Sequence, residues 1–114
     1  MTKKREKLEG RNGTQLDAVD FEPYLNETFE ITSEVLGTRA MELVSVETSR
    51  HRNPVRGRPG FSMLFWEAGA TQHAQERATL SHPECGTLEF LIVPIHPMDA
   101  GREGPGACYQ IIIN

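Results

Sequence analysis

Short runs in which apolar and polar side chains alternate dominate this chain, and glycine or proline separates most of the runs. A period of two places every other side chain on one face of a β-strand. An amphipathic helix needs apolar residues three and four positions apart, and no convincing pattern of that kind is present. The sequence therefore predicts an all-β fold, arranged as a small antiparallel barrel or a two-layer sandwich. A mixed α+β fold is the alternative if the segment 16–25 forms a longer helix. About six strands are predicted, at 27–31, 41–48, 61–66, 77–81, 87–95 and 108–113.

In two of the predicted strands, the pattern of apolar residues bears on which face is buried. In 41–48 the apolar residues do not keep one period, so we expect a strand but leave its buried face open. In 87–95 the residues Leu88, Phe90 and Ile92 alternate with Glu89, Leu91 and Val93, which makes the strand apolar on both sides toward its end. Such a strand is typically central in a sheet or lies against a partner.

The length of the chain bounds its organisation. One hundred and fourteen residues fit a single domain. Met1 and Leu8 are the only large apolar residues of the first fifteen, and glycines interrupt that segment. We therefore expect a flexible basic N-terminal arm at 1–15 and one β domain at 16–114.

The apolar runs are too short for a membrane protein. The longest is Phe90–Val93, followed by Pro94 and Ile95, whereas a membrane helix needs roughly 20 residues. The basic residues near the N-terminus resemble the start of a signal peptide, but Leu8-Glu9-Gly10-Arg11 stands where an apolar stretch is required. We expect no membrane association and a cytoplasmic location, unless an assembly carries the protein elsewhere.

The charge is unevenly distributed around a formal net value of −4. The first eleven residues hold five basic and two acidic side chains, and the segment 49–60 holds four arginines and no acid, so the remainder is strongly acidic. An acidic body disfavours nucleic acid, and no aromatic residues alternate with the basic ones to stack bases. Contacts with acidic surfaces of other proteins are the better match. We expect these contacts to involve Lys3, Lys4, Arg5, Lys7, Arg50, Arg52, Arg56, Arg58 and Trp66.

The sequence around His82-Pro83-Glu84-Cys85 has the residue types of a metal site, but no second ligand pair with suitable spacing accompanies it. We interpret it as a turn between two strands and predict no metal and no cofactor. Cys85 and Cys108 are expected to be reduced residues with a packing role.

No catalytic residues are predicted. Ser62, Ser81 and the two cysteines are potential nucleophiles, but none lies in a strand–turn–helix elbow or beside a helix start. The segment Gly57–Gly60 has the glycines of a phosphate-binding loop without the lysine and helix that should follow. A non-enzymatic protein is therefore the expectation.

Several motifs match a known pattern in order and spacing from Phe21 to the C-terminus. They are Phe21–Phe29, Leu43–Val46, Arg58–Phe65, Gln75, His82–Ile95 and Tyr109–Asn114. In these motifs the chain resembles an uncharacterised bacterial family of small β-domains, a domain of unknown function whose members are often encoded near phage-tail-like proteins. The resemblance brings no catalytic residues with it. It implies a small structural or accessory component, carried within a virion or tail-like assembly.

Three functions are compatible with these observations. The first is a structural or adaptor protein that acts through protein contacts or self-assembly, including a homo-oligomer. The resemblance implies that it is an accessory component of a phage tail-like assembly. The second is a ligand-binding barrel with a pocket lined by Phe61, Phe65, Trp66 and Phe90, which a filled core would argue against. The third is an enzyme, which needs His73 or His82 near a carboxylate in a cleft. We expect the first.

Overall fold

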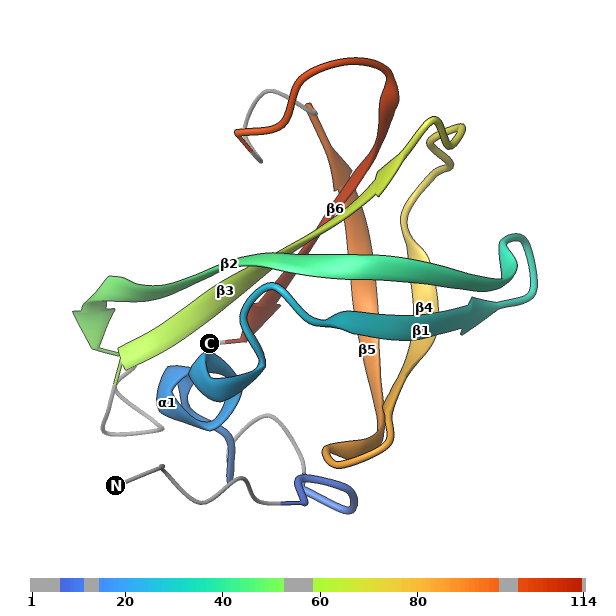
Figure 1. Ribbon diagram of the computed structural model, residues 1–114. Helices are drawn as coiled ribbons and strands as arrows, with labels where there is room; N and C mark the ends of the chain where they lie inside the picture. The colour runs from blue at the N-terminus through green and yellow to red at the C-terminus, as the bar shows by residue number, and fades with distance from the viewer. Residues whose placement is uncertain (1–6, 12–14, 53–58, 97–100, 114) are drawn as a thin grey trace.

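The computed structural model shows a closed antiparallel β-barrel of six strands (Figure 1). It describes residues 7–11, 15–52, 59–96 and 101–113, except for the side chains of 50–52. The strands follow one another around the barrel in the order β1-β2-β3-β6-β5-β4. The elements are α1 (Ala18–Phe21), the 3-10 helix η2 (Glu22–Tyr24), β1 (Thr28–Ser33), β2 (Gly37–Arg52), β3 (Pro59–Ala68), β4 (Glu76–His82), β5 (Gly86–Ile95) and β6 (Gly106–Ile113).

The predicted all-β class is confirmed, and the barrel rather than the sandwich is the architecture. Each of the six predicted strands lies within or overlaps an observed one. The α+β alternative is wrong, because α1 has only four residues and Pro23 lies in the 3-10 turn that follows it. No helix in the described part of the chain has the length and apolar character needed to cross a membrane.

The ambiguous pattern of 41–48 has a structural cause. Leu43 pairs with Phe65, but the next paired residue of β2 is Ser45, opposite Leu64, so a register shift leaves Val44 as an extra residue. A β-bulge of this kind changes which residues of a strand face the core. Met41 and Leu43 are buried before the bulge, and Val46 packs against the core after it.

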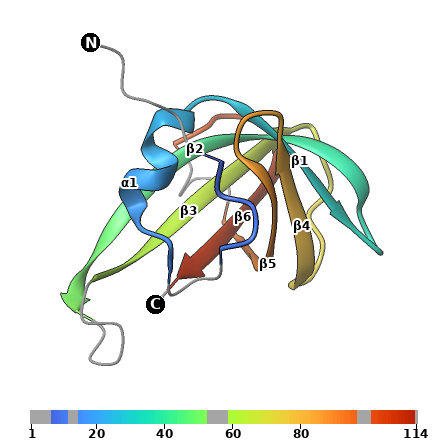
Figure 2. The same ribbon diagram turned by 90° about the horizontal axis from the view of Figure 1, so that it is seen from below.

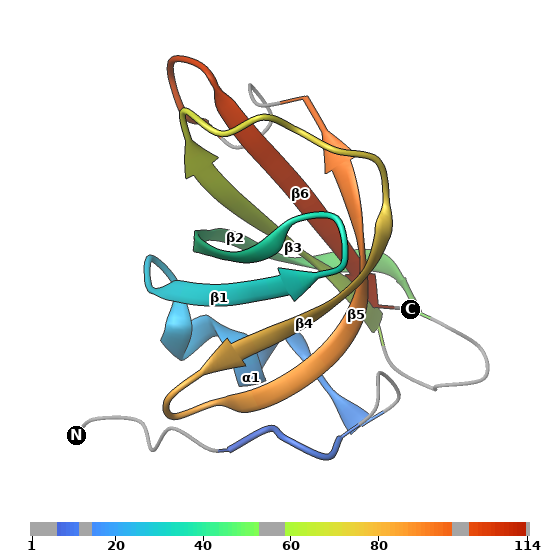
Figure 3. The same ribbon diagram turned by 90° about the vertical axis from the view of Figure 1, so that its right-hand side faces the viewer.

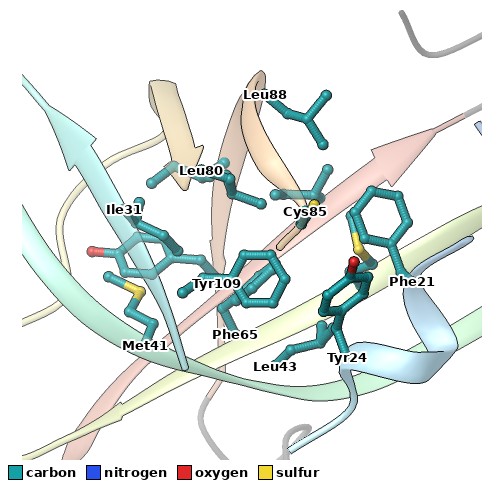
Figure 4. Packing of buried hydrophobic residues seen from close by; sticks show 14 of the residues in the cluster. Phe21, Tyr24, Ile31, Met41, Leu43, Phe65, Leu80, Cys85, Leu88 and Tyr109 are labelled. Carbon is teal, nitrogen blue, oxygen red and sulfur yellow. The ribbon is translucent and has the colours of Figure 1, made fainter. Parts of the chain in front are cut away.

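The interior of the barrel is filled by apolar side chains from all six strands and from the helical turns. Figure 4 shows Phe65 and Tyr109 between Ile31 on one side and Tyr24 on the other. The Phe29 and Phe65 rings meet edge to face with centroids 5.5 Å apart, and Tyr109 is completely buried. The phenol oxygen of Tyr109 accepts a hydrogen bond of 2.8 Å from the backbone N–H of His73, so the polar tip of this core residue is satisfied.

The part of the predicted N-terminal arm that the structure describes packs on the barrel, so a flexible arm is not confirmed there. Leu8 is 1% exposed and belongs to the core, and its N–H donates to the carbonyl of Cys85 at 2.7 Å. The N–H of Thr87 donates to the Glu9 carboxylate at 3.1 Å. Figures 2 and 3 show this segment beside the β4–β5 turn, with α1 across the same end of the barrel. One buried leucine is enough to anchor a polar segment, because burying it contributes about 1.5 to 3 kcal/mol.

Strands β5 and β6 pair over only three residues of each, from Val93 opposite Gln110 to Ile95 opposite Cys108. At that end the side-chain amide of Gln72 bridges the two strands. Its nitrogen donates to the Ile95 carbonyl at 2.9 Å, and its oxygen accepts from the Cys108 N–H at 2.8 Å. A side chain from the β3–β4 connection thus helps to close the barrel where its ladder is shortest.

Candidate functional site

Most of the basic residues predicted to bind partners lie outside the described residues, namely Lys3, Lys4, Arg5, Arg56 and Arg58. Arg50 and Arg52 belong to β2 by their backbone, and their side chains are outside the description. Lys7 is described and exposed, with its Nζ 3.5 Å from Oε2 of Glu9. Contacts through these residues therefore stay a prediction.

Trp66, the remaining predicted partner residue, is 6% exposed but does not belong to the core cluster. Its ring lies so close to Gly106 that a Cβ on that glycine would stand 2.4 Å from the indole, so only glycine fits there. Arg102, in the connection between β5 and β6, lies 2.9 Å from Glu42, the neighbour of Trp66 on β2. Trp66 therefore packs on the outside of the barrel beneath this connection, rather than on an open surface.

The predicted turn at His82-Pro83-Glu84-Cys85 is confirmed, and the imidazole holds it together. The backbone N–H groups of Glu84 and Cys85 donate to Nδ1 of His82 at 3.1 and 3.4 Å. A nitrogen that accepts hydrogen bonds carries no proton, so the neutral ring carries its proton on Nε2. That nitrogen donates to the Glu27 carboxylate at 2.8 Å.

The His82–Glu27 pair has the composition of an acid–base dyad but the surroundings of a structural pair. Both ring nitrogens already have partners, and the imidazole is packed between Tyr24 and Phe29, with centroids 4.8 and 5.0 Å away. Its side chain is 7% exposed. Within the described residues no group of three or more His, Cys, Asp or Glu side chains is arranged to hold a metal ion. The arrangement stabilises the β4–β5 turn.

Three hollows formed by described residues lie on the outer surface. They comprise one of about 280 Å³ on β2, β3 and β6, one of about 390 Å³ near the β1–β2 turn, and one of about 200 Å³ beside α1. None of the three is lined by Phe65, Trp66 or Phe90, although Phe61 contributes to the first. The filled interior argues against the ligand-binding barrel that was considered from the sequence.

The outer face of β3, β6 and β5 carries several aliphatic side chains. Residues paired across neighbouring strands project from the same face, with Cβ atoms about 4.5 to 5.5 Å apart. The register places Leu64, Gln110 and Val93 in one row across the three strands. In the next row Ser62 pairs with Ile112. The β5–β6 ladder ends at Val93, and Leu91 is the next outward residue of β5, where it pairs with Arg77 of β4. We call these six residues of β3, β6 and β5 the outer apolar face.

Solvent reaches a large part of this face. The exposed fractions are 55% for Ile112 and 45% for Leu91, whereas Leu64, Val93 and Gln110 are half-buried. The small Ser62 stands between Glu47 and Ile112 in its row, and the hollow of about 280 Å³ lies over it. The face thus presents projecting aliphatic side chains beside a depression.

Part of this surface was foreseeable. The apolar character of both sides of 87–95 predicted either a central strand or a partner, and Leu91 on its outer side is exposed. Gln110 and Ile112 were not identified, because the run Ile111-Ile112-Ile113 gives no indication of which residue faces outward. Pairing with β3 and β5 determines that orientation.

Comparison with known proteins gives a family but no activity. A family model described as Domain of unknown function (DUF6916) matches residues 16–113. No curated protein and no solved structure matches the chain. The match begins after the N-terminal segment and contains all six strands.

Proposed function

The chain belongs to the family Domain of unknown function (DUF6916), and we propose that it is a non-enzymatic structural or adaptor protein that acts through protein–protein contacts. One observation carries the proposal: an aliphatic surface lies exposed on strands of the closed barrel. In antiparallel sheets that are solvated on one side, the outward residues are usually polar. Here Leu64, Val93, Ile112 and Leu91 project outward together. Exposed aliphatic side chains gathered on one face typically mark a contact site.

The composition of the face supports a protein partner rather than a small molecule. Its centre holds no charged side chain, and the nearest carboxylates, those of Glu47 and Glu89, stand at its edges. An uncharged centre with a polar rim is the usual arrangement of protein interfaces. The depression over Ser62 is shallow and open, whereas small ligands are generally enclosed in clefts.

The setting we propose is an accessory component of a phage tail-like assembly, as the resemblance noted for Phe21–Asn114 implies. The protein would then work in the cytoplasm or within that assembly. In this setting the basic residues at Lys3, Lys4 and Arg5 and the arginines of 49–60 provide a second kind of contact, toward acidic neighbouring surfaces.

Site-specific photo-crosslinking in cells that naturally produce the protein tests the proposal. A photoreactive amino acid is placed at Ile112 on the outer apolar face, and a matched variant carries it at Val35, which is 64% exposed in the β1–β2 turn. Protein adducts that form at position 112 and not at 35, identified by mass spectrometry, support a contact surface. Equal labelling at both positions, or no adduct at 112, contradicts it.

A further inference from the structure

The residue at the centre of the outer apolar face is Gln110. Aliphatic side chains flank it on both sides, since it pairs with Leu64 on β3 and with Val93 on β5. Its side-chain amide makes no hydrogen bond to any residue that the structure describes. A half-buried amide surrounded by aliphatic groups requires a partner when the face is covered, because an unsatisfied amide in an interface is costly.

A glutamine amide is complementary to a copy of itself. It carries a carbonyl oxygen that accepts and an NH₂ group that donates, so two amides facing each other satisfy one another. A charged side chain at this position would repel its own copy. We propose that the occupant of the outer apolar face is a second copy of this chain, so that two copies pack face to face about a two-fold axis that runs along β6. This inference rests on the proposed function and names the partner.

The row of Leu64, Gln110 and Val93 is compatible with such an axis. A two-fold axis along β6 brings Gln110 against Gln110 of the other copy and superposes the β3 side of one face on the β5 side of the other. Val93 of one copy then meets Leu64 of the other, so an aliphatic group faces an aliphatic group on each side of the paired amides. An isologous interface requires this kind of self-complementary row.

Electrostatics agree with this arrangement. Glu47 lies at the β2 end of the row of Ser62, and Glu89 lies one outward position beyond Leu91 on β5, 3.7 Å from Arg77 of β4. The central row of Leu64, Gln110 and Val93 contains no charged side chain. Because apolar packing and neutral amides hold the two copies together, added salt should not dissociate them.

Charge reversal at Gln110 tests the two-fold axis directly. We compare the full-length protein with Gln110→Glu and Gln110→Lys, separately and mixed, and with Val35→Glu as a control that adds the same charge elsewhere. Sedimentation velocity measures the fraction of dimer over a dilution series from about 1 μM to about 1 mM. This range covers dimers with weak and with moderate dissociation constants. Circular dichroism of each variant verifies that the barrel is intact.

The inference predicts a concentration-dependent dimer for the unmodified protein and for Val35→Glu. Each Gln110 variant alone should dimerise about tenfold or more weakly, because two like charges meet across the axis, and the mixture should recover dimers of one Glu and one Lys copy. A monomer at every concentration, or a dimer that neither substitution weakens, overturns the inference. If crosslinking at Ile112 captures only a different protein while the purified chain is monomeric, the proposed function stands and the second copy is excluded.

Discussion

The backbone N–H of Leu8 donates to the carbonyl oxygen of Cys85 at 2.7 Å, which joins the N-terminal segment to the turn between β4 and β5. The leucine side chain enters the core at the same point. This contact makes Leu8 part of the folded domain, although the family match begins only at residue 16. A deletion of 1–15 would therefore remove a core residue together with the basic ones.

Leu8→Ala should lower the free energy of unfolding by about 2 to 4 kcal/mol, because it removes a fully buried side chain and leaves a cavity. Urea denaturation measures the change. Val35→Ala is the matched control, since Val35 is 64% exposed, and it should change stability by less than about 0.5 kcal/mol. Equal effects of the two substitutions would contradict the anchoring role of Leu8.

Gly86→Ala should be more destabilising than Gly37→Ala. Both glycines have positive φ angles, of 90° and 68°, which costs a residue with a Cβ about 1 to 2 kcal/mol. A Cβ at Gly86 would also stand 2.6 Å from the Cβ of Glu9, whereas nothing lies within 4 Å of one at Gly37. The difference between the two melting temperatures measures how firmly the N-terminal segment packs on the turn. If both substitutions cost the same, Glu9 does not pack against Gly86 in solution.

Gln72→Ala should destabilise the protein by about 1 to 3 kcal/mol, because it removes the bridge between Ile95 and Cys108. Gln72→Glu keeps the size of the side chain but replaces the NH₂ donor with a carboxylate oxygen, which would face the Ile95 carbonyl. This substitution should therefore also destabilise the protein. Gln75→Ala, at an exposed position in the same connection, is the control. Thermal unfolding of the three variants distinguishes a hydrogen-bonding role of Gln72 from a packing role. Because Gln72→Glu preserves packing, a melting temperature equal to that of the unmodified protein would contradict the hydrogen-bonding role.

The neutral form of His82 should carry its proton on Nε2, because Nδ1 accepts from two backbone N–H groups. The ¹⁵N chemical shifts of the imidazole report the tautomer directly. His82→Phe keeps an aromatic ring beside Tyr24 but leaves those two N–H groups without their acceptor. It should lower the free energy of unfolding by about 2 kcal/mol or more. A proton found on Nδ1 would show that the turn is held in another way.

Most strands could be located from the sequence because they keep a period of two over enough residues to reveal a face, although the run Ile111-Ile112-Ile113 does not. Phe61, Met63 and Phe65 were expected on one face and are buried together. The exception was the strand containing Val44, where one extra residue breaks the period, and only pairing with β3 reveals the bulge.

Long-range contacts were harder to foresee. Closure into a barrel depends on a ladder of three residue pairs between β5 and β6 and on the Gln72 bridge, and neither leaves a local pattern. Leu8 is an isolated apolar residue in a polar segment, so no periodicity marks it as core. From the sequence, Trp66 was a candidate for both the core and an interface. In the structure it is buried on the outside of the barrel. The local sequence does not distinguish this position from a core position or from an interface position.

The measurement that tests the central claim most directly is the mass of the purified full-length protein by light scattering, at low salt and at about 0.5 M salt. At the higher concentration, screening shortens the reach of electrostatic interactions to about 4 to 5 Å. The account predicts the mass of a dimer under both conditions, because the outer apolar face around Gln110 and Ile112 holds the copies together without charge. A monomer at both salt concentrations, or an oligomer that dissociates as salt is added, would contradict a second copy as the occupant of this face.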